Sequence, residues 1–182
     1  STLAEMVDAG MKACAMEVSS HGLELRRVES VDFDAAVFTN LTHDHLDFHG
    51  TMERYFAAKL KLFTSLKKDA LAVINVDDPY GRKIIDACTV RTVTYGVERD
   101  ADYRADDIHL GVEETSFTLI HEGKEYPVKT NLVALFNVYN LLAAIAVLAE
   151  SVMPLEEILP YTGHIHQVAG RIERICEGQP FN

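Results

Sequence analysis

The alternation of short apolar runs with helical patterns is the sequence feature that most constrains the fold. Four runs are apolar enough to be buried strands, namely 13–18, 33–41, 71–76 and 90–95. Helical patterns follow two of them, at 51–66 and 80–88. Buried strands that alternate with helices predict an α/β fold, a mostly parallel sheet with helices on both faces.

The pattern changes after Gly96. The stretch around 102–130 alternates between apolar and polar residues and contains a Glu122-Gly123 turn signal, which predicts a small antiparallel sheet attached to the main one. Two further helices are predicted at 138–148 and 155–161.

The length of 182 residues allows one domain with a sizeable core. We expect this domain to cover residues 1–170 and the polar tail, 171–182, to be a linker. The chain has no initiator Met and opens directly on a helix-start pattern at Thr2. We therefore expect it to be a piece of a longer protein.

Charge and cysteine usage narrow the class of protein. A net charge of −11 leaves no broad basic surface, which argues against nucleic acid as the main partner. The three cysteines are widely spaced and form no CxxC, which favours a reducing, cytoplasmic location. No apolar run reaches the roughly 18 residues of a membrane span.

The predicted helix at 51–66 carries a lysine in the middle of its apolar face. On a helical wheel Lys59 lies within the apolar stripe, whereas Lys61 lies on the opposite face. Burial favours the neutral amine, which can react with CO₂ to form a carbamate. The alternative is a lysine paired with Asp44 or Asp47, and helix geometry alone does not choose between them. The stripe consists of Met52, Tyr55, Phe56, Leu62, Phe63 and Leu66.

Polar residues follow the first two predicted strands. Glu17 ends the first strand, where a carboxylate suits Mg²⁺ or, alternatively, caps a helix or pairs with an arginine. The loop after the second strand contains His43, His45, Asp47 and His49. This cluster is similar to the HxHxDH motif of metallo-hydrolases, but its spacing is H-x-H-x-D-x-H. Hydrogen bonding within the loop is the alternative for each histidine.

Two weaker signals lie near the C-terminus. Asn137 and Asn140 share one face at a helix start, where they could cap the helix or contact a ligand. Arg171 follows a glycine in a polar segment and could clamp a phosphate or lie in solvent.

Five segments together resemble the Mur ligase family, most closely its MurE type. EVSSHGL and NLTHDHLDFHGT carry the most specific similarity. The resemblance implies the central, P-loop-type ATPase domain of these ligases, with a sheet incomplete at its N-terminal side and a hinge at 171–182. The matching segments, in family order, are 15–28, 33–63, 74–79, 136–144 and 168–175.

The resemblance also implies roles for individual residues. Glu17 would bind the Mg²⁺ that accompanies the ATP phosphates, His45 would bind a second Mg²⁺, and Lys59 would be the carbamylated lysine. The remaining implied roles are contacts to the UDP-muramoyl-peptide by Ser19 and Arg27, and contacts to ATP by Asn137, Asn140 and Arg171.

The implied activity is an ATP-dependent amide ligation in peptidoglycan synthesis. The family adds the third amino acid, diaminopimelate or lysine, to UDP-MurNAc-L-Ala-D-Glu. The substrate carboxylate attacks the γ-phosphate of ATP, and the amine of the incoming amino acid then attacks the resulting acyl phosphate.

The sequence departs from the family pattern in three respects. It contains no GxxxxGK[ST] phosphate loop, it lacks the family's N- and C-terminal domains, and Ala134 stands where the family usually has Gly. We therefore expect these 182 residues alone to be inactive. The alternatives are a related ligase such as folylpolyglutamate synthase, a non-catalytic remnant that has lost nucleotide binding, and a dinuclear metal hydrolase.

Overall fold

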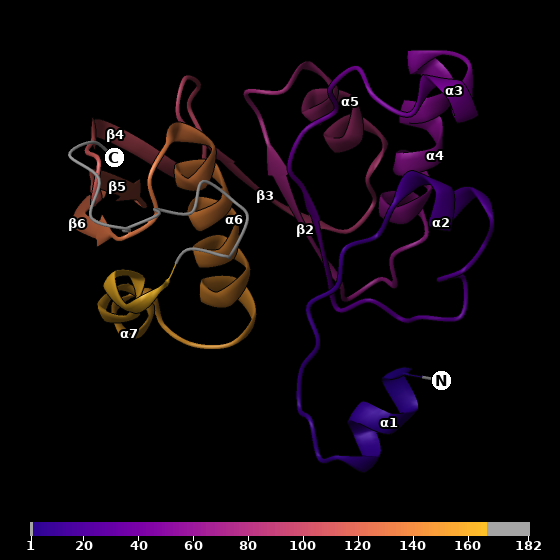
Figure 1. Cartoon of the computed structure of the whole chain (residues 1–182), viewed down its shortest axis with the longest axis horizontal. Coiled ribbons are helices and arrows are strands. Elements are labelled where there is room, and N and C mark those ends of the chain that lie inside the picture. The colour runs from indigo at the N-terminus through magenta and orange to yellow at the C-terminus, as the bar shows by residue number, and fades with distance from the viewer. Residues whose placement is uncertain (1, 167–182) are drawn as a thin grey trace, which may run out of the picture.

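The protein is built on one six-stranded sheet in the order β1-β2-β3-β4-β5-β6. The structure is a computed structural model and describes residues 2–166 (Figure 1). Strands β1 to β4 run parallel, and β5 and β6 continue the sheet in antiparallel fashion. The strands are β1 (Ala35–Phe38), β2 (Leu71–Asn75), β3 (Arg91–Gly96), β4 (Tyr103–Leu110), β5 (Thr115–His121) and β6 (Lys124–Thr130).

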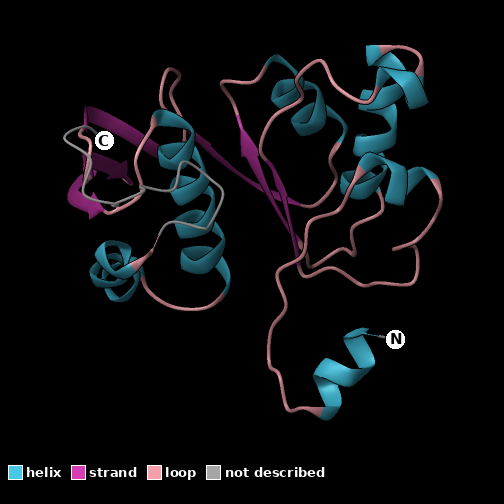
Figure 2. Cartoon of the chain, in the orientation of Figure 1, coloured by secondary structure: helices cyan, strands magenta, loops and turns pink. Residues whose placement is uncertain are grey.

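Helices cover both faces of this sheet, as predicted (Figure 2). Helices α4 and α5 pack on one face, and the long helix α6 packs on the other. The helices are α1 (Thr2–Asp8), α2 (Ser20–Glu24), α3 (Leu46–His49), α4 (Met52–Thr64), α5 (Pro79–Ala87), α6 (Leu135–Ser151) and α7 (Leu155–Ile158), with a 3₁₀ turn η1 (Leu159–His164).

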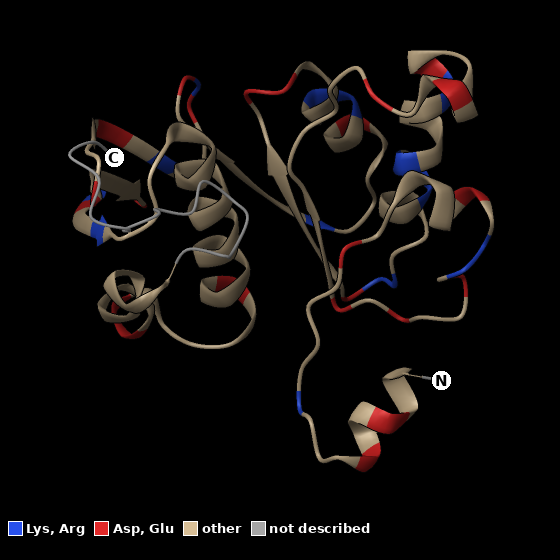
Figure 3. Cartoon of the chain, in the orientation of Figure 1, with Lys and Arg blue, Asp and Glu red and all other residues tan. Residues whose placement is uncertain are grey.

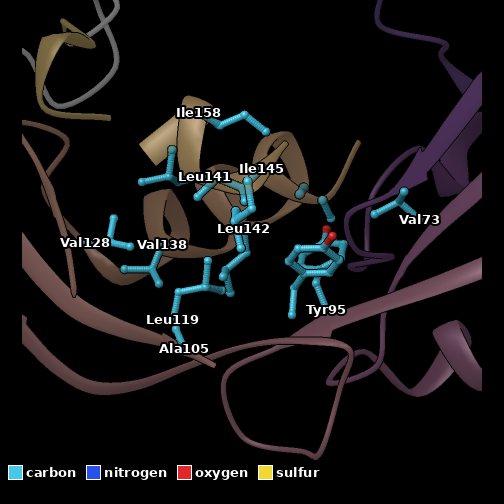
Figure 4. Packing of buried hydrophobic residues seen from close by; sticks show 14 of the residues in the cluster. Val73, Tyr95, Ala105, Leu119, Val128, Val138, Leu141, Leu142, Ile145 and Ile158 are labelled. Atoms are coloured by element: carbon cyan, nitrogen blue, oxygen red, sulfur yellow. The ribbon is translucent and has the colours of Figure 1, made fainter. Parts of the chain in front are cut away.

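Strand β2 is buried on both sides and separates two hydrophobic cores. Leu71 and Val73 belong to the core under α6, which Figure 4 shows from close by, and Ala72 and Ile74 belong to the core under α4 and α5. This division follows from the alternation of side chains along a strand. An apolar run with no polar alternation is therefore what this central position requires.

The antiparallel part is an extension of the main sheet. β4 meets β3 over two residue pairs, Tyr95 with Tyr103 and Gly96 with Arg104. The β5–β6 hairpin turns at Glu122 and Gly123, with φ values of 49° and 72°. Two positive φ values are typical of the tight turn that suits the twist of a hairpin, so the predicted turn is confirmed.

The strand predicted at 13–18 was wrong. Residues 11–19 form neither helix nor strand, and all of them except Val18 are exposed. Figure 1 shows this segment leading away from the sheet to α1, which has no buried residue. An apolar run becomes a strand only where a neighbouring strand satisfies its backbone groups. Within residues 2–166, β1 pairs with β2 alone.

Two further predictions concern a membrane-spanning helix and a broad basic surface. Within residues 2–166, no helix is both long and apolar enough to cross a membrane. Figure 3 shows lysines and arginines dispersed among more numerous acidic residues, with no continuous basic stripe in that view. The linker predicted at 171–182 lies outside the described residues.

Candidate functional site

The candidate site lies at the edge of the sheet where β1, β2 and β3 end. Because these strands are parallel, the loops that follow them meet at one edge, the usual ligand site of an open α/β sheet. A small cavity of about 40 Å³ opens beside the end of β1. It is lined by Val18, Leu23, Val37, Phe38, Thr39, Asn40, Lys59, Leu62 and Phe63.

Lys59 lines this cavity from helix α4. Thr51 begins the helix, where its Oγ1 accepts a hydrogen bond of 3.3 Å from the Arg54 N–H. Lys59 is half-buried, and its Nζ lies 5.6 Å from the centre of the Tyr55 ring. Burial lowers the pKa of Lys59, and the negative charge of Glu17 opposes that effect. The environment therefore makes the amine easier to deprotonate than that of an exposed lysine.

The alternative explanation of Lys59, an ion pair with Asp44 or Asp47, was wrong. No ion pair among residues 2–166 includes Lys59. Lys61, by contrast, is exposed and pairs with Glu24 at 2.6 Å. The helical wheel thus separated the two lysines correctly.

Glu17 and His45 approach Lys59 from two other segments. Glu17 lies in the exposed stretch before α2, within electrostatic reach of the Lys59 amine. His45 precedes α3 in the left-handed region, with φ of 54°, and its ring meets the Tyr55 ring edge-on at 5.8 Å. Tyr55 therefore contacts both Lys59 and His45. We call Glu17, His45, Tyr55 and Lys59 the lysine cluster.

The other histidines of the loop do not form a hydrolase centre. His49 is buried, its Nε2 lies 2.9 Å from the Ser20 hydroxyl, and its ring stacks on Tyr55 at 5.1 Å. Burial, followed by the charge of His21, lowers the pKa of His49. Over residues 2–166, no three His, Cys, Asp or Glu side chains are placed to hold a metal ion. This arrangement argues against the dinuclear hydrolase.

The donors of the lysine cluster fit a different kind of metal site. Mg²⁺ commonly binds through one or two protein side chains, water and the phosphates of a bound nucleotide. Glu17, an exposed carboxylate at the edge of the cluster, suits that role. His45 is half-exposed, and its Nδ1 lies 3.6 Å from the Asp44 carboxylate.

Ser19 and Arg27 flank helix α2. The Ser19 Oγ accepts a hydrogen bond of 3.1 Å from the Gly22 N–H and so caps the helix. Arg27 is exposed, and its backbone N–H donates to the Gly22 carbonyl at 2.8 Å. Their roles as substrate contacts stay predictions.

Asn137 and Asn140 lie on the first turns of α6. They share one face, because Asn140 Nδ2 donates to Asn137 Oδ1 at 3.3 Å. The helix begins at Leu135 after Ala134, so neither asparagine is its N-cap, and Asn137 Nδ2 donates instead to the Val133 carbonyl at 2.7 Å. The capping alternative was therefore wrong, and ligand contact stays a prediction.

The predicted site residues that the structure describes fall into separate groups. No hydrogen bond or ion pair within residues 2–166 joins the asparagine pair to the lysine cluster. Arg171, predicted near the phosphates, lies outside the described residues. Reasoning from sequence missed Tyr55 as a contact of Lys59, and missed Asp77 and Tyr139, which form a 2.9 Å hydrogen bond. A signal was available, since acidic residues directly follow the buried strand β2.

Comparison with known proteins finds relatives that match almost the whole chain. The sequence profile of the Mur ligase middle domain matches residues 1–148. The chain is 46% identical over 181 residues to the UDP-N-acetylmuramoyl-L-alanyl-D-glutamate--2,6-diaminopimelate ligase of Streptomyces coelicolor, covering 98% of this chain and 36% of that protein. The ligase of the same name from Halalkalibacterium halodurans is 42% identical over 183 residues, 99% of this chain and 38% of that protein.

Solved structures show the same fold. A structure of UDP-N-acetylmuramoyl-L-alanyl-D-glutamate--2,6-diaminopimelate ligase superposes with a TM-score of 0.79 at 34% identity, over 87% of this chain and 34% of that chain. MurF ligase from Thermotoga maritima in complex with ADP has a TM-score of 0.70 at 23% identity, over 80% of this chain and 33% of that chain. The chain spans little more than a third of the length of the two curated relatives.

Proposed function

The chain belongs to the Mur ligase family, and we propose that it is the nucleotide-binding middle domain of an ATP-dependent ligase. The ligase would join diaminopimelate to UDP-N-acetylmuramoyl-L-alanyl-D-glutamate in peptidoglycan synthesis, in the cytoplasm. The names of the relatives that match almost the whole chain support this substrate pair. The ADP complex of a structural neighbour supports the nucleotide.

One observation carries the proposal, namely the half-buried Lys59 with Glu17 within electrostatic reach and Tyr55 beneath it. Its lowered pKa increases the share of neutral amine relative to an exposed lysine, and that amine would add CO₂ and lose a proton to become a carbamate. The carbamate would carry a negative charge where a lysine normally carries a positive one. Lys59 would then attract a cation into the cavity instead of repelling it.

Glu17 would hold one Mg²⁺ ion and His45 a second, and the Lys59 carbamate would hold or orient a metal. The metal, when bound, would offset negative charge on the ATP phosphates. Tyr55 keeps the His45 ring and the Lys59 side chain on one surface, since it touches both.

The remaining residues would bind the two large substrates. Asn137 and Asn140 present a hydrogen-bonded pair of amides to ATP from the start of α6, and Arg171 would reach its phosphates. Ser19 and Arg27 would contact the UDP-muramoyl-peptide. These contacts would hold the substrate carboxylate close to the γ-phosphate for the first step.

The test compares Lys59 with Lys61 in the full product of the gene that encodes this chain. Lys59→Ala should lower ATP-dependent ligation by at least about 100-fold, because the substitution removes the carbamate and its charge. Lys61→Ala is the control, since Lys61 lies on the same helix but forms an exposed ion pair with Glu24, and it should change the rate by less than about 3-fold. Equal losses in the two variants would contradict the role of Lys59.

Two further measurements complete the test. Isotope-labelled bicarbonate should give a carbamate signal in the wild type that is absent from Lys59→Ala. The full gene product should use diaminopimelate in preference to lysine, and residues 1–182 alone should not catalyse ligation. A full gene product no larger than this chain would favour the non-catalytic remnant instead.

A further inference from the structure

Three side chains at the end of β2 and in the loop after it form hydrogen bonds to the neighbouring loops at the carboxyl edge of the sheet. Asn75 Nδ2 donates to the Thr39 carbonyl at 2.7 Å, and Asn75 Oδ1 accepts from the Asp77 N–H at 3.0 Å. Asp78 Oδ2 accepts from the Leu41 N–H at 2.8 Å. The loop after β1, which leads to His45, is therefore fastened to the end of β2 at two points.

Asp77 forms hydrogen bonds to the loop after β3, on the other side of β2 from β1. Its carboxylate accepts hydrogen bonds from the backbone N–H groups of Val97, Glu98 and Arg99, at 2.6, 2.9 and 2.9 Å. These residues form the loop after β3. The carboxylate thus compensates three N–H groups that have left the sheet, and it fixes the path of the loop.

The fourth donor to Asp77 comes from α6. The Tyr139 hydroxyl donates to Asp77 Oδ2 at 2.9 Å. Tyr139 lies between Asn137 and Asn140 in the sequence, on the same turns of the helix. Because one helical turn moves nearly as a rigid unit, the position of this hydroxyl sets the position of both amides.

We propose that Asp77, acting through Tyr139, is a positioning residue that holds Asn137 and Asn140 in place for the nucleotide. The inference rests on the proposed function. The Asp77 carboxylate accepts four hydrogen bonds from the protein, and it would act on the nucleotide through the helix start that it anchors.

The chain contains a closely matched control on the same helix. Near the other end of α6, Glu150 Oε1 accepts a hydrogen bond of 2.8 Å from the hydroxyl of Tyr103. Both contacts are tyrosine–carboxylate bonds of nearly equal length that join α6 to the sheet region. Only the Tyr139 bond lies beside the asparagine pair.

The experiment measures steady-state kinetics of the full gene product carrying Tyr139→Phe or Tyr103→Phe. Each substitution removes one hydroxyl and leaves the ring, so both variants should fold and lose similar thermal stability. Tyr139→Phe should raise the KM for ATP about 5- to 10-fold with kcat within about 2-fold, whereas Tyr103→Phe should leave the KM for ATP within about 2-fold.

The outcomes separate the inference from the proposed function. An active wild type whose KM for ATP is equally unaffected by both substitutions overturns the inference and leaves the proposed function standing. An equal rise in KM in both variants also overturns it, because that result reports general loosening of α6. A wild type that does not turn over ATP overturns the proposed function, and the inference falls with it.

Discussion

The start of α6 and the N-terminal segment 2–19 stand in contrast within one chain. At the start of α6, Tyr139 donates a hydrogen bond to Asp77, and Asp77 in turn accepts hydrogen bonds from the loop after β3. In the N-terminal segment, α1 has no buried residue and the side chains of Met11 and Met16 are 58% and 43% exposed. Both regions carry residues that the Mur ligase resemblance assigns to function.

The contrast shows which half of the candidate site this chain builds by itself. The asparagine pair is carried by a helix packed on the core and fixed by side-chain hydrogen bonds. Glu17 and Ser19 are carried by a backbone segment with no strand beside it in the described part of the chain. A site can therefore have one preorganised wall and one wall whose position depends on further contacts.

The largest change in the free energy of unfolding is expected when a buried side chain of α6 is shortened. Leu142 is fully buried, so Leu142→Ala should lower the free energy of unfolding by about 3 kcal/mol through lost burial and the cavity left behind. Leu148, on the same helix and 37% exposed, is the control and should cost less than about 1 kcal/mol as Leu148→Ala. Urea denaturation measures both. Similar losses would mean that α6 is not anchored through its buried face.

A smaller effect with a distinct pH dependence is expected at Asp77. Burial alone would raise the pKa of this carboxyl, but the hydrogen bonds from Val97, Glu98, Arg99 and Tyr139 outweigh burial and hold its pKa below the ordinary value. The folded state therefore favours the ionised form more than the unfolded state does. The resulting stability is fully present above about pH 4, the ordinary aspartate range, and is lost as the pH falls through the lowered folded value.

Asp77→Asn should accordingly lower the free energy of unfolding by about 2 kcal/mol at neutral pH, because the amide cannot accept all of these bonds. The gap to the wild type should shrink below about pH 4. Asp86→Asn is the control, since Asp86 is exposed and pairs with the exposed Arg82 at 3.4 Å, and it should change stability by less than about 0.5 kcal/mol. A gap at Asp77 that is constant with pH would refute the ionised-acceptor explanation.

A gain in stability of about 1 kcal/mol is expected from Ala134→Gly. Ala134 has φ of 76° and ψ of 149°, a backbone conformation that a Cβ disfavours and that glycine adopts freely. Thermal unfolding measures the change, with Ala144→Gly in the exposed middle of α6 as a control that should destabilise. An unchanged or lower midpoint for Ala134→Gly would show that the conformation carries no strain.

The sequence predicted the α/β arrangement of the sheet and the burial of Lys59 well, for identifiable reasons. The uninterrupted apolar run of β2 requires a strand covered on both faces, and the wheel placed Lys59 on the buried face without any knowledge of its neighbours. The family resemblance predicts a glycine at the position of Ala134, and the structure gives this residue a positive φ. Each of these inferences depends on local pattern or local backbone geometry.

The failures have a common physical cause, because they depend on partners distant in sequence. The run at 13–18 has the composition of a strand but no ladder partner within residues 2–166. The bond between Asp77 and Tyr139 spans 62 positions, and no periodicity connects them. Composition reports what a segment can become, and only the surrounding fold decides which hydrogen bonds it makes.

The smallest effect is expected in the N-terminal segment. In this chain Met16→Ser should change the free energy of unfolding by less than about 0.5 kcal/mol, because an exposed side chain loses little burial. Met52→Ser is the control, since Met52 packs partly buried against the core under α4, and it should cost about 1–2 kcal/mol. Chemical denaturation of both variants in this chain tests the comparison.

The same two substitutions in the full gene product test whether residues 13–18 pair with a neighbouring strand there. The apolar pattern at 13–18 predicts a strand wherever a neighbouring strand is supplied, and Met16 would then be buried. The cost of Met16→Ser should therefore rise to about that of Met52→Ser in the longer protein. If the cost of Met16→Ser stays near zero in the full gene product, residues 13–18 remain exposed there. The positions of Glu17 and Ser19 would then depend on bound substrate.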